Sequence, residues 1–186
     1  MSEAIIPKAV NAVLDFPFDW ATWLGDGETI NSHEVTVPSG ITKDSDSKSG
    51  GVVTVWLSGG TAGEIYTVAC KIATSLSRTI ERSIDVYVLE RVVETFQKDP
   101  SDVLEYPFDW VNHPTGRWLG ESETISSHVI SADTGITVDS DSESGGIVTA
   151  WLSGGTAGTS YDVACKIVTS DGRTDERTIK ILVQQR

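Results

Sequence analysis

The sequence predicts an all-β protein made of two tandem antiparallel β-sandwich domains. The chain repeats itself over most of its length, its apolar residues alternate with a period of two, and no apolar run has helical spacing. Each repeat is long enough to fold alone, whereas the units that stack into solenoids are about 20–47 residues long. These observations favour two separate small β domains over one large domain or a solenoid.

The repeat is an internal duplication. Residues 13–20 return as residues 103–110 at an offset of 90, with 6 of 8 residues identical. Residues 23–91 return as residues 118–186 at an offset of 95, with 43 of 69 identical. The second copy therefore carries five extra residues between its first two tryptophans, within Val111–Arg117.

The offsets also define the expected domain boundaries. The segment between the two copies contains neither Gly nor Ser runs, so we expect a semi-rigid connection rather than a flexible tether. The expected organisation is an N-terminal extension at 1–12, domain 1 at 13–91, a linker at 92–102 and domain 2 at 103–186.

Alternating residues define the strands within each copy. Tyr66, Val68, Cys70 and Ile72 alternate with more polar neighbours, which is typical of a strand with one face in a core. Residues 161–167 repeat this pattern. Further strands are expected at 28–37, 41–44, 51–57, 84–88, 146–152 and 179–183.

The last two strands of each copy are expected to form a hairpin. In the second copy Asp171-Gly172 lies between them, and Asp-Gly between alternating strands is a strong hairpin signal. The first copy has Leu76-Ser77 at the same place, so we expect a different turn there.

The order of the last three strands resembles one end of an immunoglobulin-like domain. A strand containing Trp leads through Gly-Thr-Ala-Gly into Tyr-x-Val-x-Cys, and a hairpin then leads into the final strand. Each copy has a single cysteine, Cys70 or Cys165, so the disulfide of antibody domains is absent and both cysteines are expected in the core. The expected fold is therefore two tandem immunoglobulin-like antiparallel β-sandwich domains.

Composition excludes several classes of partner. The 186 residues have a formal net charge of −13 and offer no basic cluster, which argues against nucleic acid and against anionic lipid surfaces. The N-terminus lacks the basic start and apolar run of a secretory signal, and no stretch approaches the ~20 apolar residues of a membrane helix. We therefore expect the protein to fold in a cytoplasm.

Aromatic residues are the main candidates for partner binding. The six tryptophans occupy equivalent positions, 20/110, 23/118 and 56/151, and Trp56 and Trp151 are assigned to the core. The other four are interpreted as packing residues or, alternatively, as a surface strip that docks a partner. The candidate partner-binding residues are Phe18, Trp20, Trp23, Phe108, Trp110, His113, Arg117 and Trp118.

Metal sites are not expected. The acidic stretches at 44–50 and 139–145 lack the sixth-position Gly and twelfth-position Glu of an EF-hand loop, so they are interpreted as solvated turns, with a weak calcium site as the alternative. His33 and His128 have no second His or Cys at metal spacing and are expected to be surface or packing residues.

Enzymatic activity and cofactors are not expected either. The chain has no Gly-x-Ser-x-Gly elbow, and its repeated Ser-Gly-Gly-Thr-Ala-Gly segment is followed by a strand rather than by a helix that could bind phosphate. Two copies of a small sandwich without a cleft-forming insertion fit binding or scaffolding better than catalysis.

Several motifs in fixed order resemble those of a known family. The segments in the second copy are 99–110, 118–119, 123–125, 135–140, 148–158 and 172–177. In this order they are similar to a family of small proteins of tailed bacteriophages, described as phage fiber–tail adaptor or virion neck/tail proteins. Residues 99–186 follow the pattern nearly throughout, and residues 13–91 follow it well.

The resemblance implies a non-enzymatic virion protein, assembled in the host cytoplasm, that links tail or neck to fibers. The implied partners are tail, neck or fiber subunits, contacted by several copies of the protein on a symmetric ring. Two other functions stay open. One is a carbohydrate- or receptor-binding module, and the other is a calcium-stabilised bacterial surface repeat.

Overall fold

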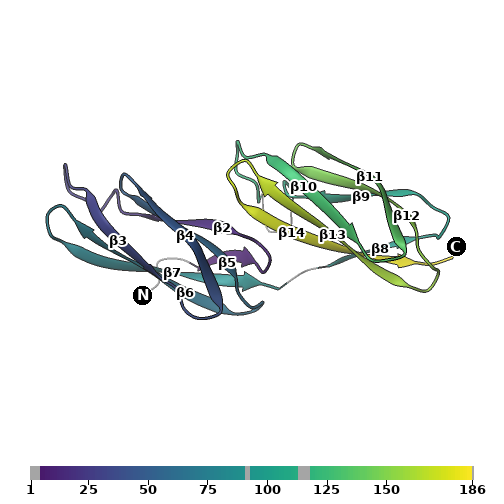
Figure 1. Cartoon of the computed structure of the whole chain (residues 1–186), viewed down its shortest axis with the longest axis horizontal. Helices are drawn as coiled ribbons and strands as arrows, with labels where there is room; N and C mark the ends of the chain where they lie inside the picture. Colours follow the sequence, from purple (N-terminus) through teal and green to yellow (C-terminus); the bar gives the residue numbers. More distant parts are fainter. Residues whose placement is uncertain (1–4, 91–92, 113–117, 186) are drawn as a thin grey trace. The chain divides into compact units, whose positions relative to one another are not determined.

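The computed structural model describes residues 5–90, 93–112 and 118–185. The chain divides into two compact units, Met1–Arg91 and Val92–Arg186, which are called domain 1 and domain 2 below. All regular secondary structure in the described part of the chain consists of β-strands (Figure 1).

Domain 1 is a sandwich of two sheets. One sheet has the strand order β1-β7-β6-β3 and the other has the order β2-β5-β4. β1 runs parallel to β7, whereas the other paired strands are antiparallel. The strands are β1 (Ile5–Ala9), β2 (Leu14–Asp19), β3 (Ile30–Thr36), β4 (Ile41–Ser49), β5 (Val52–Gly59), β6 (Ile65–Thr74) and β7 (Thr79–Leu89).

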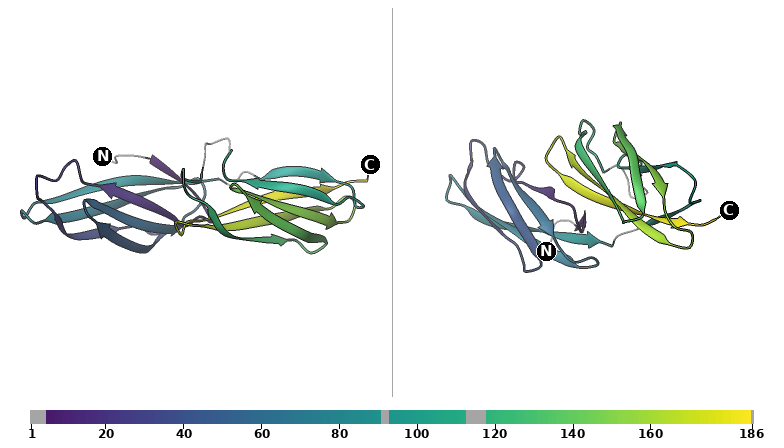
Figure 2. Two further views of the ribbon diagram at one scale, coloured as in Figure 1. Left: turned by 90° about the horizontal axis from the view of Figure 1, so that it is seen from above. Right: turned by 45° about the vertical axis from the view of Figure 1, so that its right-hand side comes forward.

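Domain 2 repeats this arrangement. Its sheets have the orders β10-β13-β14-β8 and β11-β12-β9, with β8 parallel to β14. In each domain the two sheets form two facing layers (Figure 2). The strands are β8 (Glu94–Lys98), β9 (Leu104–Asp109), β10 (Ile125–Ala132), β11 (Ile136–Ser144), β12 (Ile147–Gly154), β13 (Ser160–Thr169) and β14 (Thr174–Val183).

This topology is that of an immunoglobulin-like sandwich and confirms the expected fold class. A tyrosine at the start of the sixth strand fixes the preceding loop in both domains, as in a tyrosine corner. The Tyr66 hydroxyl accepts a hydrogen bond of 3.0 Å from the Thr61 amide, and the Tyr161 hydroxyl accepts one of 3.0 Å from the Thr156 amide.

The expected boundaries need one correction, because segments 1–12 and 92–102 each contain a strand of the adjoining domain. β1 and β8 hydrogen-bond to the last strand of their own domains. Lys8 and Lys98 lie in these strands and are almost fully buried. A buried lysine interrupts the apolar alternation by which a strand is recognised in a sequence. Lys8 and Lys98 are nevertheless separated by 90 residues, the same offset as residues 13–20 and 103–110, so the sequence did show that they are equivalent.

Each buried lysine links its edge strand to the loop after the fifth strand. The Lys8 Nζ donates to the carbonyl oxygens of Ala9 at 3.0 Å and Gly59 at 2.8 Å. The Lys98 Nζ donates to those of Asp99 at 2.8 Å and Gly154 at 2.9 Å. These hydrogen bonds compensate the desolvation of the ammonium groups.

The placement of the tryptophans differs in part from the expectation. Trp20 and Trp110 are fully buried among the core residues of their domains. Trp56 is only half-buried and Trp151 is 39% exposed, so their assignment to the core was wrong. In β5 the inward positions are occupied by Val53, Val55 and Leu57, and alternation therefore directs the intervening Trp56 outward.

The two cysteines lie where expected. Cys70 and Cys165 are free thiols buried in the cores of domain 1 and domain 2. Burial raises the pKa of Cys70 to about 11 and the pKa of Cys165 to about 12. Both therefore act as small apolar core residues rather than as reactive thiols.

The acidic stretches are strands rather than the expected turns. β4 extends to Ser49 and β11 to Ser144, and each turn begins at the following glycine. Asp46 accepts a 2.8 Å hydrogen bond from His33, and the equivalent contact between Asp141 and His128 is 2.6 Å. These bonds join the edge strands of the two sheets in each domain.

The two hairpin turns are alike, contrary to the expectation from their sequences. Ser77 has a φ of 59° and Gly172 a φ of 83°. The Ser77 amide donates a hydrogen bond of 3.0 Å to the Thr74 carbonyl, and the Gly172 amide donates one of 3.1 Å to the Thr169 carbonyl. Ser77 therefore adopts a left-handed conformation that favours glycine.

This turn yields a prediction about stability. Ser77→Gly is expected to stabilise domain 1 by about 1 kcal/mol, because it relieves the left-handed strain of a residue with a Cβ. Gly172→Ser is the matched change in domain 2 and is expected to destabilise it by a similar amount. Urea unfolding of the full chain, with amide hydrogen exchange to identify the domain, measures both. Equal stability of Ser77→Gly and wild type would contradict the strain argument.

A pair of tryptophan substitutions tests the inward and outward assignments. Trp110→Ala is expected to destabilise domain 2 by about 3–5 kcal/mol, because it leaves a large cavity in the core. Trp151→Ala is expected to cost less than about 1 kcal/mol, because the side chain lies on the outer face. The same unfolding measurement compares them, and similar losses for both variants would refute the assignment.

Candidate partner-binding surfaces

The structure separates the eight candidate residues into three groups. Phe18, Trp20, Phe108 and Trp110 are at most 3% exposed and belong to the cores, where no partner reaches them in the folded domains. His113 and Arg117 lie outside the described residues. Trp23 and Trp118 remain; both are half-buried, in the loops that follow β2 and β9.

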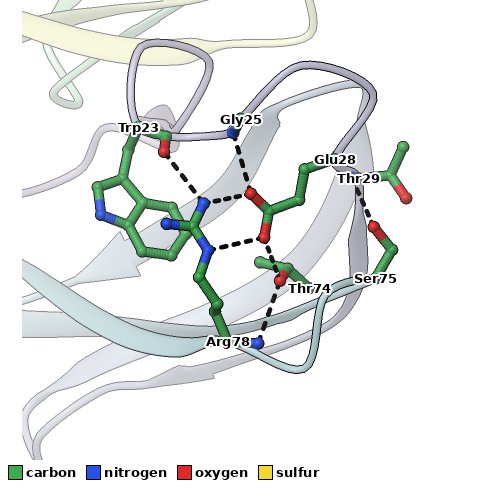
Figure 3. Close-up of polar contacts among 7 residues, drawn as sticks. All are labelled: Trp23, Gly25, Glu28, Thr29, Thr74, Ser75 and Arg78. Carbon is green, nitrogen blue, oxygen red and sulfur yellow. Dashed lines mark hydrogen bonds and ion pairs between the residues drawn. The ribbon is translucent and has the colours of Figure 1, made fainter.

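In domain 1, Trp23 belongs to a cluster that joins the β2–β3 loop to the β6–β7 hairpin (Figure 3). The Arg78 guanidinium lies over the Trp23 ring at 4.0 Å from its centroid. Its Nε donates to Glu28 Oε1 at 2.9 Å, and its Nη2 donates to Glu28 Oε2 and to the Trp23 carbonyl. Glu28 also accepts bonds from the Gly25 amide and the Thr74 hydroxyl. Every oxygen of this buried carboxylate is therefore engaged.

Domain 2 builds the same cluster from equivalent residues. Arg173 lies over the Trp118 ring at 4.6 Å, donates through Nε to Glu123 at 2.8 Å, and donates to the Trp118 carbonyl at 3.2 Å. The Gly120 amide donates to Glu123 at 2.9 Å. The cluster thus holds the same loop at the same end of both domains, and its tryptophan is stacked within its own domain.

The electrostatics of the cluster favour a structural role. Hydrogen bonds from Arg78, and next from Thr74, lower the pKa of Glu28 to about 2 from an ordinary value of 4.5. The carboxylate is therefore ionised at neutral pH and fully occupied by its donors. It is suited to fixing the loop and not to proton transfer.

The cores of the two domains differ beside their buried tryptophans. In domain 2 the Trp110 Nε1 donates to Asp175 at 2.9 Å, and burial raises the pKa of Asp175. Domain 1 has Ile80 at the position of Asp175. Among the described residues, the buried Trp20 Nε1 has no hydrogen-bond partner. The two domains therefore differ in their cores as well as in the length of the loop after the second strand.

Domain 2 also contains a hollow of about 280 Å³ between the loop that follows β9 and the β11–β12 turn. Val111 and Leu119 provide its apolar wall, and Glu121 and Glu143 add carboxylates. Val111 begins the segment that carries the five extra residues of this copy. The hollow therefore lies where the two copies differ most in length.

The outer faces of the three-stranded sheets carry Trp56, which is half-buried, and Trp151, which is exposed. Trp56 lies on β5 directly opposite Asp15 of β2 and Ser45 of β4. Trp151 lies on β12 opposite Glu105 of β9 and Ser140 of β11. Trp56 and Trp151 were expected in the core and therefore were not among the candidate partner-binding residues. The alternating polar positions, Thr and Ser two residues either side of each tryptophan, already indicated the outer face.

Metal-ligand clusters and membrane-spanning helices are both absent from residues 5–90, 93–112 and 118–185. These residues contain no group of three or more His, Cys, Asp or Glu side chains placed to hold a metal ion. Within the same ranges, no helix is long and apolar enough to cross a membrane.

The Glu28 cluster predicts a specific pH dependence. The folded pKa of Glu28 lies below its unfolded value, so its stabilisation is complete above pH 4.5 and is lost as the pH falls towards about 2. Glu28→Gln is therefore expected to be less stable than wild type at pH 7, and the difference is expected to shrink below pH 4.5. Urea unfolding across this range, with amide exchange at Gly25, measures the effect. A difference that is constant with pH would contradict it.

Comparison with solved structures returned immunoglobulin tandems at low identity. A chimeric titin Z1Z2 functionalized with a KLER exogenous peptide from decorin is 10% identical, with a TM-score of 0.37 and coverage of 98% of this chain and 94% of that chain. The tandem Ig repeats of Dlar are 11% identical, with a TM-score of 0.37 and coverage of 100% and 96%. The strand order and pairings described above define the fold of both domains.

Comparison with protein families gave a specific result, whereas no curated protein matched the chain. The model of the podophage GP4 fiber-tail adaptor protein gp77 matches residues 8–87 and again residues 98–182. Both matches include the buried lysine of the first strand, and together they span most of the sequence. The chain therefore belongs to the podophage fiber-tail adaptor family.

Proposed function

We propose that this protein is a non-enzymatic structural component of a phage virion that links the tail or neck to fibers through its two immunoglobulin-like domains. The observation that carries the proposal is the double match to the adaptor family, one match for each domain. Each domain is a complete sandwich with its own core, so each can present a binding surface without support from the other.

The chemistry of the described side chains supports a binding role. The most deeply placed carboxylates, Glu28, Glu123 and Asp175, are paired with arginine or tryptophan within their own domains. The two thiols are buried. An adaptor present in several copies on a symmetric ring gains avidity from modest individual contacts, which suits small rigid domains of this kind.

The two domains are proposed to contact different virion proteins. Their sequences differ most in length between Trp110 and Trp118, where the second copy has five extra residues, and Val111 and Leu119 on either side of this segment line the hollow. We assign the candidate residues His113, Arg117 and Trp118 to this second binding surface. Domain 1 lacks the insertion and would bind through other residues.

Incorporation into the virion tests the proposal. The protein is expected in gradient-purified particles in a fixed multiple, measured by quantitative mass spectrometry. A chain without residues 113–117 is expected to keep its unfolding midpoint but to be incorporated less, because the domain 1 spacing of this loop is restored while the proposed contact is lost.

The control for the deletion is Lys71→Ala, an exposed change on the outer face of the four-stranded sheet. It is expected to be incorporated like wild type. Absence of the wild-type chain from purified particles would refute the adaptor function. Binding to host glycans without incorporation would favour a receptor-binding module instead.

A further inference from the structure

Arginine and tryptophan form a recurring pair in this protein. Arg78 lies over Trp23 at 4.0 Å and Arg82 over Trp20 at 4.4 Å. In domain 2 the corresponding distances are 4.6 Å for Arg173 over Trp118 and 4.9 Å for Arg177 over Trp110. Four of the six tryptophans are thus covered by a guanidinium of their own domain.

Carboxylates accompany the pairs formed by Arg78, Arg173 and Arg177. Glu28 binds Arg78 and Glu123 binds Arg173 through charged hydrogen bonds. Asp175 accepts from Trp110 and lies 3.5 Å from the Arg177 Nε. The recurring unit is therefore an indole face and a carboxylate that hold one guanidinium between them.

Trp56 and Trp151 have the aromatic and acidic parts of this unit but no cation. Among the described residues, no arginine or lysine lies over either ring, and neither Asp15 nor Glu105 forms an ion pair. Asp15 and Glu105 are exposed and lie directly opposite the tryptophans across the strand pair. Residues opposite each other in this way have Cβ atoms about 5 Å apart.

The surroundings of the two tryptophans are acidic or hydroxylic. Ser58 donates to Asp44 at 2.8 Å, and Ser153 donates to Asp139 at 3.0 Å, so each sheet edge carries a second oriented carboxylate. The nearby Lys43 is engaged elsewhere, because its Nζ lies 2.6 Å from Asp46 and contacts the Val35 carbonyl on the other sheet. Charge complementarity therefore favours a cationic occupant for this face.

We infer that Trp56 with Asp15, and Trp151 with Glu105, are docking positions for arginine side chains of a partner protein. Each position supplies the indole face and carboxylate that the domain's own arginines use elsewhere. Arginine suits the position better than lysine, because its planar guanidinium stacks on an indole and presents a fork of donors to a carboxylate. The inference rests on the proposed adaptor function only for the identity of the partner as a virion protein.

A peptide titration tests the chemistry without requiring the partner. The full chain is titrated with a blocked tri-arginine peptide, and the indole Nε1–H resonances are followed by NMR at low salt. The resonances of Trp56 and Trp151 are expected to shift, and those of the buried Trp20 and Trp110 are not. Trp56→Ala with Trp151→Ala is expected to weaken peptide binding about fivefold or more.

Charge variants separate the specific site from general attraction to an acidic protein. Asp15→Asn with Glu105→Gln is expected to reduce the shifts. Glu34→Gln with Glu64→Gln removes two exposed charges elsewhere and is expected to leave the shifts unchanged. Equal effects of the two double variants, or no shift in the wild type, would overturn the inference. A larger shift with a neutral trisaccharide than with the peptide would also overturn it, in favour of sugar stacking.

Virion incorporation then tests the partner. Asp15→Arg with Glu105→Arg fills each position from within the chain, and this variant is expected to keep the wild-type unfolding midpoint but to be incorporated poorly. Normal incorporation of this variant would refute docking at these positions, whereas absence of the wild-type chain from particles would refute the adaptor function instead. The peptide titration tests the docking chemistry independently of both incorporation results.

Discussion

Side-chain alternation along the central strands of the three-stranded sheets is the constraint on which the arrangement of this protein depends. With Val53, Val55 and Leu57 directed into the core, the residue between the last two must point outward, whatever its size. A strand that packed Trp56 inward would expose all three aliphatic residues. The outward position of Trp56 is therefore a consequence of register, and the polar residues on either side of it form the surface on which the docking inference rests.

Much of the fold was predictable because it depends on patterns that are local in sequence. The duplication, the alternating strands and the Tyr-x-Val-x-Cys segment led to the immunoglobulin-like sandwich. β1 and β8 were missed because each has five residues, one of them a buried lysine, and burial of a charged residue depends on acceptors distant in sequence. The turn at Ser77 was misjudged because tertiary constraints imposed a left-handed residue where the sequence provided no glycine.

The candidate site was less predictable for the same reason. Glu28 and Arg78 are 50 residues apart, and only the folded domain shows that the arginine engages both that carboxylate and Trp23. The sequence identified Trp23 as a candidate but not its partner. It could not distinguish a tryptophan stacked within its own domain from one open to a partner, because both lie in polar surroundings in a single acidic chain.

The contrast between covered and uncovered tryptophans also has an energetic basis. A guanidinium held over Trp23 by the chain itself is already positioned, so the domain retains that interaction in isolation. At Trp56 the indole and carboxylate are held by the sheet, and a partner needs to bring and order only one side chain. Such a contact is weak while it remains solvated and strengthens when the surrounding interface excludes water. Two equivalent positions in one chain can therefore combine weak initial encounters, guided by negative charge, with firm attachment once both domains are engaged.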